Sequence, residues 1–321
     1  MAMTPEQIRL AQNPVLTGLL LGMTQGDLIA ETLFPRLPTA LRGFTLGKIG
    51  YEHMQQYNLR RAPGSATKRI EINYEGVTYT VKQYSVEVPL PRELIQESEA
   101  MRRMNVGTNL NVSQIAMTTA AAVLALGYEI EAATLAADPT LYPSGNTAAL
   151  TGSAKWSDED GKPVSDILEA AEVIRGKTGR RPNTLLLSPG AFAAVRTNPE
   201  VRSYLSMTQL GPATLDQLKT IFNVASIVIG DAVWKDGKAA SHDVWGNNAL
   251  LAYVPSSFGG NQNNINLAEP AFGFTSVLEG NPFAEQPYYE DPSKSWIFGA
   301  TFERECVVAT PEAGFLFQTP V

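Results

Sequence analysis

Residues 47–91 constrain the fold of this chain more than any other stretch of its sequence. They have the pattern of long exposed β-strands around a basic tip, with runs over residues 49–59, 68–74 and 77–88. An isolated hairpin is only marginally stable in water, because its apolar face has nothing to pack against. No apolar segment adjoins this hairpin in the sequence, since a long helix follows it. The sequence therefore predicts that the hairpin packs on another subunit and that the chain is a building block.

The composition indicates a soluble globular chain. Its 321 residues are 44% hydrophobic and 18% charged, and the mean hydropathy is −0.09. The single cysteine, Cys306, excludes an internal disulfide and fits a reducing cytoplasm. The N-terminus lacks the basic start of a signal peptide. The most apolar run of the long helix, residues 120–127, is far shorter than the roughly 20 residues of a membrane span, so we expect no membrane partner.

Charge is distributed unevenly along the chain, which has 25 basic and 32 acidic residues and a net charge of −7. Four cations and no acids lie within residues 60–69, whereas residues 279–291 carry acids and no cation. The rest of the chain is too acidic for a general nucleic-acid binder. The basic tip is either a solvated loop or a contact for an acidic patch on another subunit. The candidate contact residues are Arg60, Arg61, Lys68 and Arg69 at the tip and Glu285, Glu290 and Asp291 in the acidic segment.

The segment before the hairpin is expected to be an arm. A short helix after Thr4-Pro5 and another over residues 28–33 are separated by turn residues, and prolines at 35 and 38 force extended chain. Its apolar side chains need a surface, in their own subunit or in a neighbour. After the hairpin tip, a turn is expected at Glu75-Gly76. The apolar residues of the strand lie at odd positions up to Val81 and at even positions from Tyr84. This change at Lys82-Gln83 predicts a β-bulge or bend there.

Helices and then an alternating region follow. Residues 92–104 and 111–137 are expected to be helical, the second about 40 Å long. The apolar set of this long helix is Ile115, Val123, Leu126, Ile130 and Leu135, with alanines throughout, which suits packing beneath a sheet. Helices and strands alternate over residues 151–268 and form an α/β unit. Strands return over residues 272–278 and 296–308.

The sequence lacks the usual patterns of catalytic and cofactor sites. His53 and His242 lie far apart and, with one cysteine, cannot form a zinc site of usual spacing. No phosphate-binding glycine loop or dinucleotide motif is present. Ser188 is followed by proline where a nucleophile elbow needs a backbone N–H, so it is expected to cap a helix. We therefore expect no catalytic residue, no metal and no cofactor.

The order of these parts resembles one known family. Residues 29–38 resemble its N-terminal arm, residues 61–64 its extended-loop tip and residues 79–91 the strand that leads into its spine helix. Residues 182–189 resemble the strand and helix of its axial domain, and residues 296–308 its final strands. The family is that of the major capsid proteins of tailed bacteriophages, whose fold is shared with bacterial encapsulins.

The resemblance implies an α+β fold with an N-terminal arm, an extended β-hairpin loop, a peripheral domain with a long spine helix, and an α/β axial domain. The implied divisions are residues 1–46 for the arm, 47–91 for the extended loop, 92–150 and 269–321 for the peripheral domain, and 151–268 for the axial domain. It also implies self-assembly into hexamers and pentamers of an icosahedral shell around double-stranded DNA. Such a virion capsid would assemble in the cytoplasm of a bacterial host.

Further partners follow from the same resemblance. Some members of the family begin with a helical scaffolding segment, and the 46 residues before this extended loop are too few for one. A separate scaffolding protein is therefore expected, together with a portal, decoration proteins and packaged DNA that is contacted non-specifically. Two alternatives stay open: an encapsulin-like compartment that encloses protein cargo, and an α/β enzyme in residues 151–268.

Overall fold

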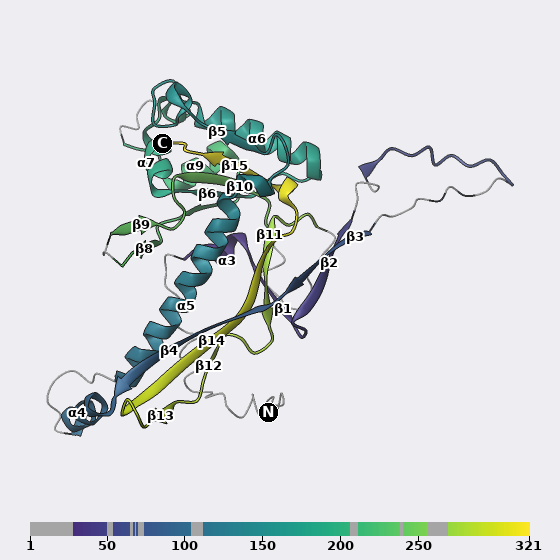
Figure 1. The fold of residues 1–321 in the computed structure, drawn as a ribbon. Coiled ribbons are helices and arrows are strands. Elements are labelled where there is room, and N and C mark those ends of the chain that lie inside the picture. Colours follow the sequence, from purple (N-terminus) through teal and green to yellow (C-terminus); the bar gives the residue numbers. More distant parts are fainter. Residues whose placement is uncertain are drawn as a thin grey trace.

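The structure is a computed structural model. It describes residues 28–49, 54–64, 67, 69, 74–103, 112–205, 211–237, 240–255 and 269–321. Figure 1 shows a long helix that joins an α/β head at one end to a slender sheet at the other, with a hairpin that leaves the body sideways. The main sheet is built on one strand, β14 (Ser295–Val308), whose 14 residues make it longer than most strands.

Both edges of β14 are occupied. β4 (Lys82–Pro91) runs antiparallel along one edge from Arg304 to Ser295. Three shorter strands succeed one another along the other edge, all antiparallel to β14: β13 (Tyr288–Glu290), β12 (Phe283–Ala284) and β11 (Gly273–Leu278). β1 (Arg36–Thr39) then pairs parallel with β11 and brings the N-terminal arm into the sheet. The six strands thus draw on three distant parts of the sequence.

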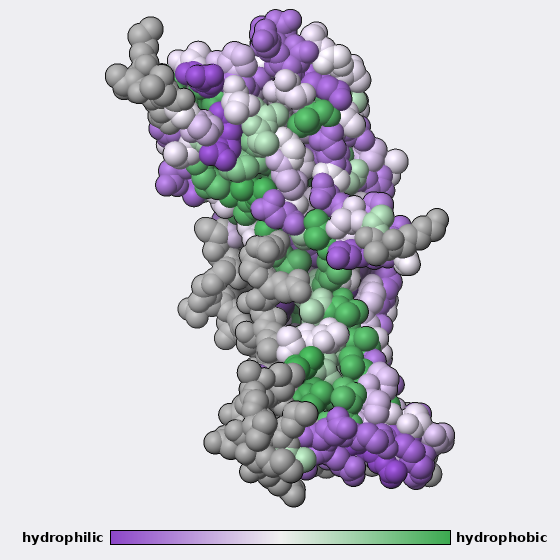
Figure 2. Space-filling model, turned by 90° about the vertical axis from the view of Figure 1, so that its left-hand side faces the viewer, coloured by the Kyte–Doolittle hydropathy of each residue, from purple (hydrophilic) through white to green (hydrophobic). Residues whose placement is uncertain are grey.

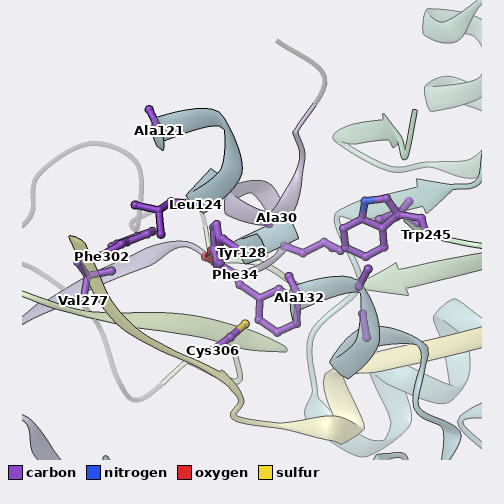
Figure 3. Close-up of a cluster of buried hydrophobic side chains, with 14 of the residues drawn as sticks. Ala30, Phe34, Ala121, Leu124, Tyr128, Ala132, Trp245, Val277, Phe302 and Cys306 are labelled. Atoms are coloured by element: carbon purple, nitrogen blue, oxygen red, sulfur yellow. Dashed lines mark hydrogen bonds between the residues drawn. The ribbon is translucent and has the colours of Figure 1, made fainter. Parts of the chain in front are cut away.

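The spine helix α5 (Val112–Ala137) lies across this sheet with its alanine-rich face inward. That face also buries Met117, Leu124 and Tyr128. In Figure 3, Leu124 and Tyr128 lie near Phe302 of β14 in one apolar cluster. Alanine lets a helix approach a sheet closely, because its side chain ends at Cβ. By length and hydropathy α5 would also pass as a membrane span, but core helices pass the same test.

The expected apolar face of α5 is wrong. Ile115, Val123 and Ile130 are 46%, 51% and 37% exposed, while small residues occupy the buried face. Large branched side chains on the inner face would hold the helix farther from the sheet. Close packing of a long helix therefore favours alanine over most of the inner face, with Met117, Leu124 and Tyr128 as the larger residues there.

The head is a five-stranded sheet in the order β5–β15–β10–β6–β7 with helices on one face. The strands are β5 (Thr147–Ala149), β6 (Thr184–Leu187), β7 (Ser226–Ile229), β10 (Asn248–Ala252) and β15 (Gly314–Gln318). The helices are α6 (Pro163–Thr178), α7 (Pro189–Thr197), α8 (Pro199–Ser203) and α9 (Leu215–Phe222). Alternate residues face opposite ways: Leu185 and Leu187 pack under the helices, and Leu186 joins the cluster around α5.

The last strand enters the head and not the main sheet. β15 pairs with β10 on one side and with β5 on the other. Residues 314–318 therefore lie with the α/β sheet, although the sequence pattern grouped them with the return strands of residues 269–321. The reason is strand pairing, because β15 lies between β5 and β10 and forms hydrogen bonds with both. A small hairpin, β8 (Val233–Lys235) and β9 (Ser241–Asp243), projects from the head.

The N-terminal arm is fixed to the spine by one buried carboxylate. Helix α3 (Ala30–Leu33) precedes β1, and Leu33 and Phe34 are fully buried, as expected for apolar residues of the arm. Glu129 of α5 accepts hydrogen bonds from the backbone N–H groups of Ile29 (2.9 Å) and Ala30 (2.8 Å). It also accepts one from the indole Nε1 of Trp245 in the head, at 2.6 Å. Arm, spine and head therefore meet at this side chain.

We expect Glu129→Ala to lower the free energy of unfolding by about 3 kcal/mol or more, because it leaves three buried donors without their acceptor. Glu129→Gln should cost roughly half as much, because a single amide oxygen can still accept from Ile29 and Trp245, which share Oε1. Urea denaturation of the unassembled subunit measures both values. An equal loss of unfolding free energy in the two variants would contradict the idea that one side-chain oxygen can accept from both Ile29 and Trp245.

Candidate subunit-contact surfaces

The base of the hairpin is anchored to the main sheet. β2 (Gly43–Ile49) and β3 (Tyr74–Thr80) pair antiparallel, from Gly43 opposite Thr80 to Ile49 opposite Tyr74. Phe44 stacks on Tyr79 at 5.6 Å between ring centroids and also approaches Phe274 of β11 at 6.2 Å. Arg42, just before β2, forms a 2.7 Å ion pair with Glu303 of β14. These contacts fix the direction in which the hairpin leaves the body.

The strand that enters the body changes partner at Val81. Its outer half, β3, pairs with β2, and its inner half, β4, pairs with β14. Val81 itself is buried, and its N–H donates to the carbonyl of Arg42 at 2.8 Å. The expected break at Lys82-Gln83 thus exists but falls one residue earlier, because Lys82 and Gln83 are already in register with Arg304 and Glu303.

Farther out, the hairpin has less strand than the sequence pattern predicted. Residues 54–64 contain no strand, and the expected turn at Glu75-Gly76 is wrong, since both residues pair within β3. The expected strand over residues 68–74 lies mostly outside the described residues. The exposed tip lacks the neighbouring sheet that would favour regular pairing over coil. In the described part of the chain, neither β2 nor β3 has a third strand beside it.

The tip is both basic and apolar. Arg60, Arg61 and Arg69 are exposed, and Lys68 lies outside the described residues. Leu59, next to the arginines, is 74% exposed. A large aliphatic side chain so far from any core is unusual unless another molecule covers it. Figure 1 places this tip and strand β13 at opposite ends of the molecule, so the proposed basic and acidic groups do not meet within one chain.

The three acidic candidates differ in their surroundings. Glu285 is half-buried, and its carboxylate accepts a 2.6 Å hydrogen bond from the hydroxyl of Thr301 while lying against Gly299. Glu290 and Asp291 are exposed at the end of β13, where they contact only nearby groups, Ser293 and Lys294. Glu290 and Asp291 are therefore open to a partner, and Glu285 is held by its own subunit.

Aromatic side chains surround the exposed acids. Tyr288 and Trp296 are 47% and 39% exposed, and Tyr289 packs on Trp296 with ring centroids 5.6 Å apart. Leu94, on helix α4 (Arg92–Arg103), is also exposed at this end of the molecule. We call this surface, made of Leu94, Tyr288, Trp296, Glu290 and Asp291, the foot. The sequence analysis found the acids of the foot by their charge but missed its aromatic residues. Their exposure depends on where β14 begins, which the local sequence pattern does not determine.

A buried cation supports the sheet between hairpin and spine. Arg304 of β14 is almost fully buried and forms a 3.1 Å ion pair with Glu131 of α5. Its guanidinium lies over the ring of Tyr84 at 4.1 Å. Burial, together with the nearby Glu131, raises the pKa of Tyr84 to about 12, so this phenol stays neutral and donates its hydrogen bond to Glu131. The cluster ties β4 and β14 to α5.

Two further expectations concern metal ligands and Ser188. Within the described ranges, no three His, Cys, Asp or Glu side chains gather in a way that could hold a metal ion. Ser188 is buried and caps α7 through a hydrogen bond from the N–H of Ala191, as its sequence context predicted.

Known proteins match this chain along most of its length. The family model described as phage major capsid protein E matches residues 142–266. The major capsid protein of Burkholderia phage BcepMu is 31% identical over 274 residues, 85% of each chain. The crystal structure of a phage-related protein from Bordetella bronchiseptica RB50 is 32% identical, covers 97% of each chain and has a TM-score of 0.75. The capsid structure of cyanophage P-SCSP1u, 13% identical, covers 92% of this chain and 89% of that chain with a TM-score of 0.56, a likeness of fold alone.

The surroundings of the acids predict different effects on the isolated subunit. Glu285→Lys should lower the free energy of unfolding by roughly 1–3 kcal/mol, because it removes the acceptor of the buried Thr301 hydroxyl. Glu290→Lys, at an exposed position, should change it by less than about 0.5 kcal/mol. Thermal unfolding of the unassembled subunit compares the two. A larger loss for Glu290→Lys would mean that the foot is part of the subunit's own core.

Proposed function

This chain belongs to the phage major capsid proteins, structural subunits of icosahedral shells, and on that premise we propose that it assembles into hexamers and pentamers around double-stranded phage DNA. The family is structural, so an α/β enzyme in residues 151–268 is set aside. The chain's place is the virion capsid, and we propose that assembly takes place in the cytoplasm of a bacterial host.

The observation that carries the proposal is the hairpin that leaves the body with an exposed leucine and arginines at its tip. Its base is rigidly attached through Phe44 and Arg42, whereas its outer part contacts little of its own chain (Figure 1). Such a projection is stable in water only when its apolar groups are covered. A neighbouring copy, repeated around a ring, is the cover that a self-assembling subunit provides.

We propose that the tip of one copy docks on the foot of a neighbour. The tip offers Leu59, Arg60 and Arg61, and the foot offers aromatic rings and two exposed carboxylates. Arginine can pair with carboxylates and also stack on Trp or Tyr, at about 0.5–1 kcal/mol for each exposed contact. Each contact is weak, but a shell repeats it in every subunit.

Further partners and divisions are proposed on family membership alone. A separate scaffolding protein would set the size of the shell, a portal would admit DNA, and decoration proteins would bind outside. The acidic net charge of −7 supports only loose, non-specific contact with packaged DNA. We propose the division at residues 151 and 268 for the axial body, with residues 147–149 and 314–318 added to it by strand pairing.

The hairpin tip should be needed for assembly and not for folding. Replacing residues 59–69 by a short Gly-Ser linker should leave a soluble subunit with unchanged unfolding temperature, because these residues contribute little to the buried core. The full chain should form closed shells, visible by electron microscopy and sedimenting far faster than the variant. Normal shells from the shortened chain would overturn the proposal, and a small monomer from the full chain would argue against self-assembly.

The pairing of tip and foot predicts a charge-reversal rescue. The double variant R60E/R61E should assemble more slowly than the native chain, most clearly at low salt, where charges are least screened. Adding E290K and D291K should restore part of the rate, followed by light scattering. The matched control adds E159K and D160K instead, at an exposed acidic pair in the head. It changes the net charge by the same amount but lies outside the foot, so it should rescue less.

If the quadruple variant is no faster than R60E/R61E, tip and foot are not partners. Equal rescue by the pair E159K/D160K and by the pair E290K/D291K would indicate a general effect of net charge.

A further inference from the structure

The outer face of α5 carries an apolar stripe without a described cover. Ile115, Val123 and Ile130 are exposed, and Leu126 is partly exposed between them. Their spacing of eight, three and four residues places them along one side of the helix, about 22 Å from end to end. Figure 2 shows hydrophobic surface running down the middle of this side of the molecule, between the head and the foot. An exposed apolar stripe of this length, with Thr119 as the polar residue between Ile115 and Val123, marks a contact surface.

The N-terminal arm is anchored to α5 beside this stripe. The backbone N–H groups of Ile29 and Ala30 are bound to Glu129, which directly precedes Ile130 of the stripe in α5. The described part of the chain therefore starts beside α5, next to the C-terminal end of the stripe, and residues 1–27 precede this point in the sequence. The part nearest this anchor, residues 16–23, has the sequence Leu-Thr-Gly-Leu-Leu-Leu-Gly-Met. The sequence therefore has four leucines shortly before an anchor that lies beside the stripe.

We propose that the stripe on α5 is the docking surface of the chain's own residues 16–23. Five residues separate Met23 from the anchor at Ile29, and the eight residue steps from Leu21 to Ile29 span at most about 28 Å, so the leucines can reach the stripe. Tethering makes the contact intramolecular, with an effective concentration in the millimolar range that a second molecule seldom matches. The interaction needs no shell, so it is tested on the unassembled subunit, apart from the proposed function.

Thiol labelling can test this contact, because the chain has one cysteine and that cysteine is shielded. Cys306 is buried, and burial raises the pKa of its thiol, so it reacts slowly. A Val123→Cys variant places a reporter at the middle of the stripe, and Ser153→Cys places one at an exposed position in the head. The rate of modification by a water-soluble maleimide measures how far each position is covered.

The test changes the leucines and keeps the full chain. Replacing Leu16, Leu19, Leu20 and Leu21 by Ser should speed labelling of V123C by at least about tenfold. A tenfold change corresponds to losing ~1.4 kcal/mol of the free energy that holds the segment on the stripe. The matched control replaces Gln7, Gln12, Asn13 and Gln25 by Ser and should leave the rate unchanged. Labelling of S153C should be the same in all three backgrounds.

Three results would overturn the proposal. Equal V123C rates in the native and leucine-substituted chains would show that these leucines do not cover the stripe. Protection that grows with protein concentration would identify a second copy as the occupant. Acceleration by the polar control as large as by the leucine variant would indicate a general loosening of the chain.

Discussion

The close packing of an alanine-rich helix on one long strand supports the rest of this structure. α5 is the longest helix described and β14 the longest strand, and the main sheet, the hairpin and the head are all joined through them. β4 and the hairpin continue from one edge of β14, the short strands line the other edge, and the head sits at the C-terminal end of α5. Small side chains at the contact bring the helix close to the sheet, so that Glu131 of α5 can form an ion pair with Arg304 of β14.

That arrangement also explains how a thin molecule can serve as a shell subunit. A compact globule would bury most of its apolar side chains in one core, whereas this chain divides them between two cores and several exposed patches. Two of the patches lie on rigid supports: Leu59 beyond an anchored hairpin and Trp296 at the start of β14. Under the proposed docking of tip on foot, the contacts between copies have a defined geometry although each is weak.

The sequence predicted the spine helix, the alternating head and the return strand well, because each has a strong local signal. Alanines and a terminal Asp138-Pro139 delimit α5, the Thr214 cap begins α9, and period-two alternation marks β14. The outer hairpin and the Glu75-Gly76 turn were predicted less well. Local patterns there favour strand and turn, but pairing across β2 and β3 decides both.

The candidate contact residues divide in the same way. The sequence alone determined that a basic segment and an acidic segment exist, since charge is a property of composition. Only the tertiary structure separated Glu285, held by Thr301, from the exposed Glu290 and Asp291, and added the aromatic rings beside them. The tertiary structure also decided which face of α5 is buried. The distance between the helix and the sheet depends on the side chains of both, and the sequence of residues 112–137 contains only those of the helix.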